Sequence, residues 1–188
     1  MTSSVKKIEP RVSRAQHLLA EQVGNEFRAS QQYLAIAVWF DQRDLPRLAA
    51  HFYRRSLRKR TDALRIVQYM MDSNLAVEIP AVPTVRSDFS EPRELIALAL
   101  EQERAVTAEV ATQTRTVRED GDYLGEQFMR WFLAEQVDAV SQMSTMLNVL
   151  DRAHGNLFDV EDYLARESVG RRTNDSLAPQ TAGGAVGH

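Results

Sequence analysis

Apolar residues recur every three or four positions along four long stretches of the chain, and Pro and Gly are almost absent from these stretches. This spacing places the apolar side chains on one face of a helix, so it predicts four amphipathic helices. The stretches run from Val12 to Phe40, from Leu48 to Ser73, from about Pro92 to Asp120, and from Asp122 to Ala153. No useful length of chain alternates with the period of two that a strand requires, so the predicted fold class is all-α.

Proline and glycine fall between the predicted helices and set their limits. Pro46 and Pro92 suit the first turns of the second and third helices, with Ser90 as the N-cap of the third. Residues 74–90 contain two prolines and are expected to form a long extended crossover, whereas Gly121 ends the third helix. One long crossover between the second and third of four helices is a known connectivity of four-helix bundles.

The remaining segments complete a three-part organisation. Residues 1–11 are expected to form an N-terminal arm, and residues 12–168 a four-helix bundle with a short fifth C-terminal helix from Leu157 to Ala165. Residues 169–188 are rich in Ser, Thr, Gly and Ala and are expected to be a disordered tail.

Composition narrows the functional classes. The chain has 188 residues, 44% of them hydrophobic and 26% charged, as is typical of one soluble domain. The absence of Cys excludes disulfides, iron–sulfur clusters and thiolate metal sites. A net charge of −3 gives no reason to expect nucleic acid or a membrane as partner. There is no secretory pattern and no apolar run of about 20 residues, so a cytoplasmic location is expected.

Each apolar stripe contains one polar side chain near its middle: Glu26, Lys59, Glu103 and Gln136, with Asp62 one turn beyond Lys59. Burial of an unpaired charge is strongly unfavourable, so four such positions need a common explanation. If the middles of the helices meet, these side chains form one polar cluster in the bundle core.

Carboxylates in a bundle core are how helical proteins build di-iron sites. Two helices each supply a Glu, and each of the other two supplies a Glu-x-x-His pair on one face. Here Glu26 and Glu103 match the single glutamates. The second helix instead carries Lys59-x-x-Asp62, and the fourth carries Gln136-x-x-Ala139. The pattern of a di-iron site is therefore present without its full set of ligands.

Several longer segments carry a specific resemblance, which spans about residues 17–167: NEFRASQQYLAIAVWFD from Asn25, DLPRLAAHFYRRS from Asp44, VEIPAV from Val77, LALALEQERAVT and GDYLGEQFMRWFLAEQVDAV. These segments resemble the non-haem ferritins of actinobacteria, of the mycobacterial type. The resemblance implies a ferritin-like bundle, a hollow 24-subunit shell, and stored iron mineral. It also implies a ferroxidase centre, inside each bundle, that oxidises Fe(II).

By this resemblance, Glu26 and Glu103 match two glutamates of the ferroxidase centre, and Gln136 matches a glutamine beside the metals. Lys59 takes the place of a bridging glutamate, Asp62 that of a histidine, and Ala139 that of a further carboxylate. A Lys59 ammonium about 4 Å from a carboxylate gains about 4 kcal/mol at an effective dielectric near 20, so it can replace the missing cations. It would also repel Fe(II). The light chains of animal ferritins are similar, because a salt bridge in the core replaces the metals there too.

The expected function is an iron-storage cage subunit with a degraded ferroxidase centre, in a homomeric shell or co-assembled with a second, active ferritin. One alternative is a still-active ferroxidase in which Asp62, Glu26, Glu103 and Gln136 bind iron while Lys59 swings aside. Enzymatic activity is therefore left open, with the substitutions arguing against it.

A second alternative is a scaffold or anion-binding cage in which iron plays no part. Ferritins commonly carry acidic residues on the cavity side of the second helix, where the matching positions here include Arg54, Arg58 and Thr61. The basic run from Arg54 to Arg60 is expected either to be a solvated face that pairs with neighbouring subunits or to line the cavity.

The resemblance also suggests pore and haem positions. Glu126 and Asp122 fall at the junction that lines the three-fold pores of ferritins, although Asp122 is equally suited to cap the fourth helix. Arg60 replaces the methionine that binds haem in bacterioferritins, so no haem is expected. The four histidines match no ligand spacing: His17, His51, His154 and His188.

Overall fold

The computed structural model describes residues 14–170 and 178–183, and within these ranges it contains five helices and no strand. The helices are α1 (Arg14–Asp41), α2 (Pro46–Asp72), α3 (Pro92–Glu119), α4 (Tyr123–Arg152) and α5 (Leu157–Gly170). The predicted all-α fold with a long crossover is therefore confirmed. The expected N-terminal arm, residues 1–11, lies outside the described residues, as does His188.

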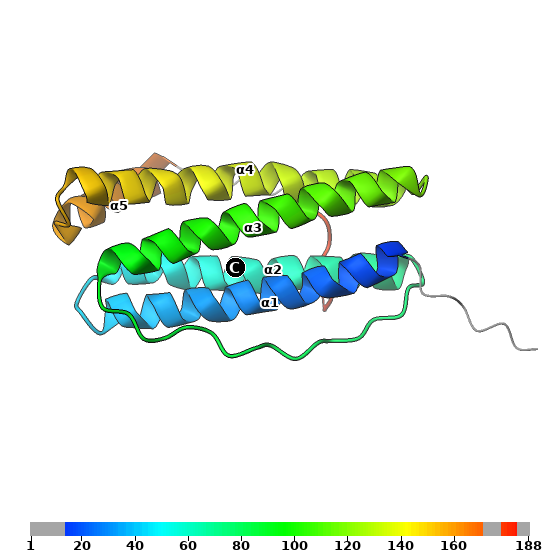
Figure 1. Cartoon of the computed structure of the whole chain (residues 1–188), viewed down its shortest axis with the longest axis horizontal. Coiled ribbons are helices and arrows are strands. Elements are labelled where there is room, and N and C mark those ends of the chain that lie inside the picture. Colours follow the sequence, from blue (N-terminus) through cyan, green and yellow to red (C-terminus); the bar gives the residue numbers. More distant parts are fainter. Residues whose placement is uncertain (1–13, 171–177, 184–188) are drawn as a thin grey trace, which may run out of the picture.

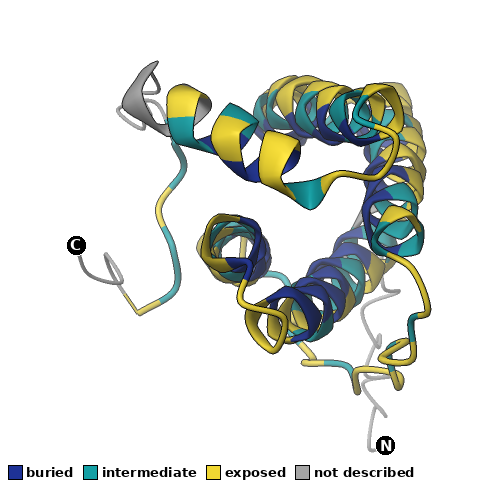
Figure 2. Cartoon of the chain, turned by 90° about the vertical axis from the view of Figure 1, so that its left-hand side faces the viewer, coloured by how far each residue is buried: buried dark blue, intermediate teal, exposed yellow. Residues whose placement is uncertain are grey.

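The helices pack as two antiparallel pairs. α1 packs on α2 and α3 on α4, and a contact between α1 and α3 joins the pairs (Figure 1). α5 lies across one end of the bundle against α2 and α4 (Figure 2). The crossover runs along α1, where the Gln32 side chain donates to the Arg86 carbonyl (2.7 Å) and accepts from the Arg86 amide (3.0 Å).

The helices begin and end close to the prolines and glycines that predicted their limits, with two differences. Pro46 and Pro92 both lie in first turns, but the N-cap of α3 is Glu91 rather than Ser90, and no side chain caps it. α5 continues beyond the predicted end at Ala165 and finishes at Gly170.

The core consists of two apolar clusters on either side of the polar layer. One lies toward the α5 end and contains the stacked rings of Phe40 and Phe52, whose centroids are 5.6 Å apart. The other lies toward the α3–α4 turn and contains Ile66, Met129 and Phe132. Because the four predicted polar positions fall between these clusters on every helix, the packing fixes them at one level of the bundle.

A short part of the C-terminal tail is also placed. Residues 178–183 run beside α2, where the Ala182 amide donates to the Leu64 carbonyl (3.1 Å) and Ala182 packs against the second apolar cluster. This part of the expected disordered tail thus has defined contacts. Among the described residues, no helix is long and apolar enough to cross a membrane.

Candidate metal centre

Three charged side chains from three helices meet at the middle of the bundle. The Lys59 ammonium of α2 lies 3.3 Å from Glu26 Oε2 of α1 and 3.1 Å from Glu103 Oε2 of α3. The side chains of both glutamates are fully buried and that of Lys59 is 3% exposed. The structure therefore brings together the residues that the sequence predicted to share a polar cluster.

Neutral side chains complete the cluster. Gln22 donates to Glu26 Oε1 (2.8 Å), and the Tyr33 hydroxyl donates to Glu103 Oε1 (2.5 Å). With its amide in the orientation that satisfies both neighbours, Gln136 of α4 donates to Glu103 Oε2 (2.8 Å) and accepts from Lys59 (3.0 Å). Glu26 Oε2 has the ion pair with Lys59 but no hydrogen bond of good geometry.

Burial and pairing shift the pKa values of the three charged groups in different directions. Burial raises the pKa of Glu26 to about 7, although Lys59 opposes this shift. Burial also acts to raise the pKa of Glu103, but Lys59, Arg55 and the hydrogen bond from Tyr33 outweigh it and hold that pKa below its ordinary value. For Lys59, burial favours the neutral amine, but Glu26 and Glu103 outweigh burial and raise its pKa. Near neutral pH the ammonium and Glu103 are charged, and Glu26 binds a proton part of the time.

Asp62 lies close to this cluster but pairs with a different cation. Its Oδ1 accepts a hydrogen bond from Arg65 Nη1 (2.7 Å), and the two side chains are only 10% and 6% exposed. Burial raises the pKa of Asp62 against the opposing charges of Lys59, Arg58 and Arg65. Sequence reasoning missed Arg65, although the Asp62-x-x-Arg65 spacing places both side chains on one helix face.

A small cavity of about 20 Å³ lies between α2 and α4 beside the cluster, and it is large enough for one water molecule. Its lining includes Ala139, which supplies no ligand atom. Two arginines of α2 bind α4 across it: Arg55 donates to Gln142 (2.6 Å), and Arg58 forms an ion pair with Glu135. The full lining is Arg55, Arg58, Lys59, Asp62, Glu135, Gln136 and Ala139.

The charges around the centre balance. Four cations, from Arg55, Arg58, Lys59 and Arg65, face four carboxylates, from Glu26, Asp62, Glu103 and Glu135. Among the residues that the structure describes, no three His, Asp or Glu side chains form a group suited to hold a metal ion. Each of the four carboxylates has at least one cation as its ion-pair partner.

The basic run on α2 is divided between partnered and solvent-facing side chains. Arg55 and Arg58 point toward α4, where they have the partners described above. Arg54 and Arg60 are exposed, and the Thr61 hydroxyl donates to the Leu57 carbonyl within the helix (3.0 Å).

The two candidate pore residues have structural partners at the α3–α4 junction. Asp122 is the N-cap of α4, and its Oδ1 accepts from the Gly125 amide at 2.8 Å. Glu126 Oε1 accepts from Arg118 Nε (2.8 Å) and Arg130 Nε (3.0 Å). The hydrogen bond from Arg118 is the main cause that lowers the pKa of Glu126.

A family model and individual known proteins both match this chain, and all of them are ferritins. The ferritin-like domain family matches residues 16–153. Ferritin BfrB of Mycobacterium tuberculosis is 53% identical over 167 residues, which cover 89% of this chain and 92% of that protein. A bacterial non-heme ferritin of Staphylococcus aureus is 31% identical over 157 residues, which cover 84% and 93% of the two chains.

A solved structure agrees on the fold. The open pore ferritin of the archaeon Archaeoglobus fulgidus superposes with a TM-score of 0.78 at 18% sequence identity. The alignment covers 86% of this chain and 100% of that chain.

Proposed function

We propose that this chain, which belongs to the ferritin family, is an iron-storage subunit whose central carboxylates are bound by its own lysine instead of by iron. Fe(II) is the substrate of the ferroxidase reaction in this family. In this chain the proposed role is structural: the subunit builds the wall of an iron-storing cage and leaves oxidation to an active ferritin or to the solution.

The observation that carries the proposal is the position of Lys59 between Glu26 and Glu103. At 3.1 to 3.3 Å each pair gains about 5 kcal/mol of Coulomb attraction at an effective dielectric near 20. Fe(II) would have to displace the ammonium from both carboxylates, and a lysine that remained nearby would repel it. Because Lys59 is almost fully buried, it could leave the two carboxylates only by rearranging within the core or toward the small cavity that it lines.

The charge balance supports the same conclusion. A metal centre attracts cations because its carboxylates exceed the cations around them. Here the local cations and carboxylates are equal in number, and the pKa of Glu26 near 7 removes part of its negative charge at neutral pH. Ala139 adds no carboxylate, and Asp62 is paired with Arg65.

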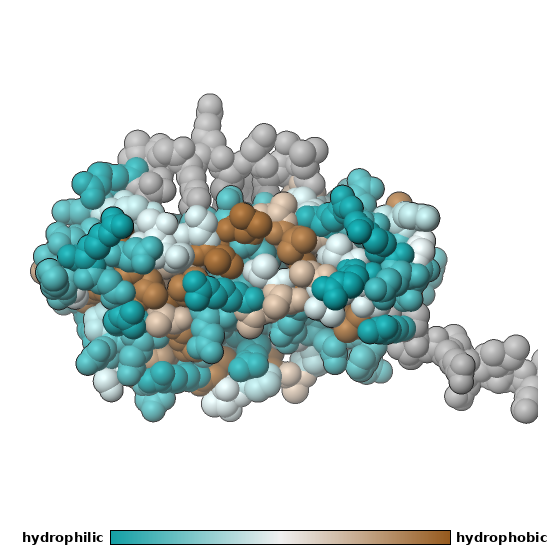
Figure 3. Space-filling view, turned by 45° about the horizontal axis from the view of Figure 1, so that its top comes forward, coloured by the Kyte–Doolittle hydropathy of each residue, from teal (hydrophilic) through white to brown (hydrophobic). Residues whose placement is uncertain are grey.

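Assembly into a shell is part of the proposal. Several large apolar side chains are exposed on the single chain, including Leu34 and Val38 on α1, Ile79 on the crossover, and Phe158 on α5. Figure 3 shows hydrophobic residues among hydrophilic ones over the face formed by α3 and α4. Contacts with further subunits would cover such residues, and we infer a 24-subunit shell, with this chain alone or mixed with a second ferritin.

Aerobic oxidation of Fe(II) tests the proposal. The iron-free shell would be mixed with about two Fe(II) per chain, beside the variant Lys59→Glu/Asp62→His/Ala139→Glu. The natural protein is expected to oxidise Fe(II) no faster than buffer, and the variant to do so with saturation. If the natural protein is fast and its rate collapses in Glu103→Ala, the centre is an active ferroxidase and the proposal is wrong. If the purified protein instead carries phosphate and takes up no iron even when mixed with an active ferritin, an anion-binding cage is the better account.

A further inference from the structure

We propose that Arg65 closes the second half of the metal centre independently of Lys59, so that Asp62 binds no metal even where Lys59 is removed. This inference rests on the proposed function, in which the centre is closed to iron. It adds a second residue that blocks metal binding. Lys59 blocks Glu26 and Glu103, and Arg65 blocks Asp62.

Lys59 and Asp62 lie on the same face of α2 but have different partners. The Lys59 ammonium points toward Glu26 of α1 and Glu103 of α3. The Asp62 carboxylate accepts from Arg65, one turn further along α2 on the side that faces α4. Removing the lysine charge therefore leaves Glu26 and Glu103 without their cation but keeps the Asp62–Arg65 pair in place.

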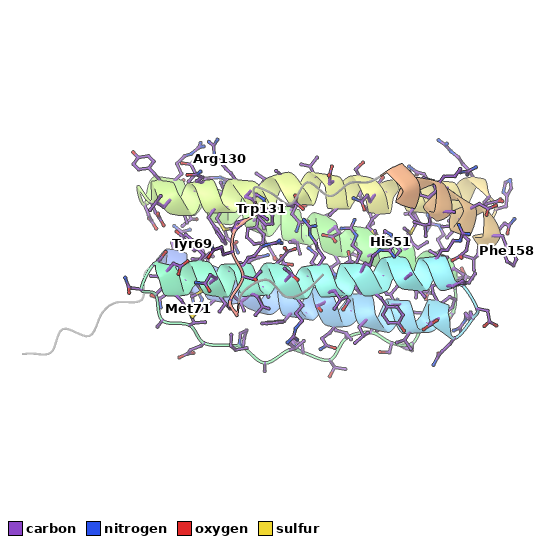
Figure 4. All side chains as sticks on the ribbon, turned by 180° about the vertical axis from the view of Figure 1, so that it is seen from behind. His51, Tyr69, Met71, Arg130, Trp131 and Phe158 are labelled. Carbon is purple, nitrogen blue, oxygen red and sulfur yellow. The ribbon has the colours of Figure 1, made fainter. Side chains whose placement is uncertain are left out.

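Arg65 is held on three sides, which makes it a poor candidate to swing away. Its Nη1 donates to Asp62, and its Nε donates to the Pro179 carbonyl of the C-terminal segment at 3.3 Å. Its guanidinium also lies 4.7 Å from the centre of the Trp131 ring of α4. Figure 4 shows Trp131 on the side where residues 178–183 pass between α2 and α4.

The chemistry of arginine suits it to keep a metal ion away from Asp62. A planar guanidinium has several fixed N–H donors, stays charged at every relevant pH, and stacks on aromatic rings. A metal ion at Asp62 would share a carboxylate whose Oδ1 already accepts from Arg65, and it would meet a buried positive charge within one helical turn. The neighbouring carboxylate, Glu135, is likewise paired with Arg58, so it offers no free substitute.

Zn(II) binding measured by titration calorimetry tests the inference, because Zn(II) is redox-inert and the readout does not depend on oxidation. The assembled natural protein gives the background from surface sites. Lys59→Glu is expected to add one Zn(II) per chain, and Lys59→Glu/Arg65→Met to add two. Adding Asp62→Ala to the double variant should remove only the second equivalent.

Matched controls separate charge from damage to the fold. Lys59→Glu/Arg54→Met removes an exposed arginine of the same helix and should still add only one equivalent. Lys59→Glu/Arg65→Gln keeps a polar side chain beside Asp62, so it gives a second test if the methionine variant fails to assemble, as judged by gel filtration. Arg65→Gln is expected to weaken the second site by less than tenfold relative to Arg65→Met.

The two proposals fail in different ways. The inference is overturned if Lys59→Glu alone binds two Zn(II) per chain and one of them depends on Asp62. It is also overturned if neither Lys59→Glu/Arg65→Met nor Lys59→Glu/Arg65→Gln binds more Zn(II) than Lys59→Glu does. If the natural protein already binds two Zn(II) that are lost in Glu103→Ala, the centre is open and the proposed function fails as well.

Discussion

Replacing Lys59 with Met tests the stabilising role of the central ion pairs. The substitution keeps most of the side-chain volume but removes the cation 3.1 to 3.3 Å from two fully buried carboxylates. Removal of one partner from a buried pair typically costs about 3–5 kcal/mol, because a buried charge is left without compensation. For a chain of this size, with a shift of about 2–4 °C per kcal/mol, the expected fall in melting temperature is roughly 6–20 °C.

The loss should depend on pH. Without Lys59, burial and mutual repulsion would raise the pKa of both Glu26 and Glu103, so at low pH the carboxyls are protonated and neutral. The full loss is therefore expected at pH 8, and a much smaller one at pH 5.5. Differential scanning calorimetry on the assembled protein, with EDTA present to exclude stray cations, measures both values.

Two controls make the result decisive. Arg54→Met removes an exposed charge from the same helix and should change the melting temperature by about 1–2 °C or less. Replacing EDTA with Zn(II) should restore part of the stability of Lys59→Met, because the unpaired carboxylates of Glu26 and Glu103 then regain a cation. If Lys59→Met is as stable as the natural protein at pH 8, or loses the same amount at both pH values, the ion pairs do not stabilise this core.

Three further substitutions test other features. The pKa of Glu26 is raised from 4.5 to about 7, so between these pH values the folded state binds a proton that the unfolded state has lost. The free energy of unfolding should therefore fall by at most about 3 kcal/mol as the pH rises from 4.5 to 7. Glu26→Gln should flatten this pH dependence of the melting temperature. Gly125→Ala should destabilise the protein by about 1–3 kcal/mol in thermal unfolding, because a Cβ there would lie 2.3 Å from Asp122 Oδ2 and disturb the N-cap. Arg130→Gln should increase Tb(III) binding at the α3–α4 junction, measured by lanthanide luminescence and abolished by Glu126→Gln, because the carboxylate loses one of its two arginine partners; unchanged Tb(III) affinity would contradict that account.

The bundle and the central cluster could be predicted because both follow from local periodicity. A helix repeats every 3.6 residues, so the stripes identified which side chains face the core. One polar residue per stripe at similar depth then predicted that Glu26, Lys59, Glu103 and Gln136 meet. The structure confirms the helices and places these four side chains together.

Arg65 and Arg130 lie within one helical turn of Asp62 and Glu126, but the burial of the Asp62–Arg65 pair and the contact of Arg118 with Glu126 could not be predicted from periodicity. Arg65 is buried because Trp131 of α4 and the carbonyl of Pro179 cover it, and such contacts join segments far apart in the sequence. Arg118 of α3 reaches Glu126 of α4 only because the α3–α4 turn folds one helix back on the other. Periodicity identifies the buried face of a helix but not which opposite charge reaches a given carboxylate.

The chemistry of the centre follows from how its charge is neutralised. Taken without the surrounding arginines, Glu26, Glu103 and Lys59 carry one excess negative charge, which burial in a low-dielectric core disfavours. The cluster reduces this charge by binding a proton, since burial raises the pKa of Glu26 to about 7, while Tyr33 and Gln136 donate hydrogen bonds to the carboxylate of Glu103 that stays ionised. Lysine and proton together thus provide the positive charge that metal ions would otherwise supply. Under the proposed function, Fe(II) would have to displace both the lysine and the proton to reach these carboxylates.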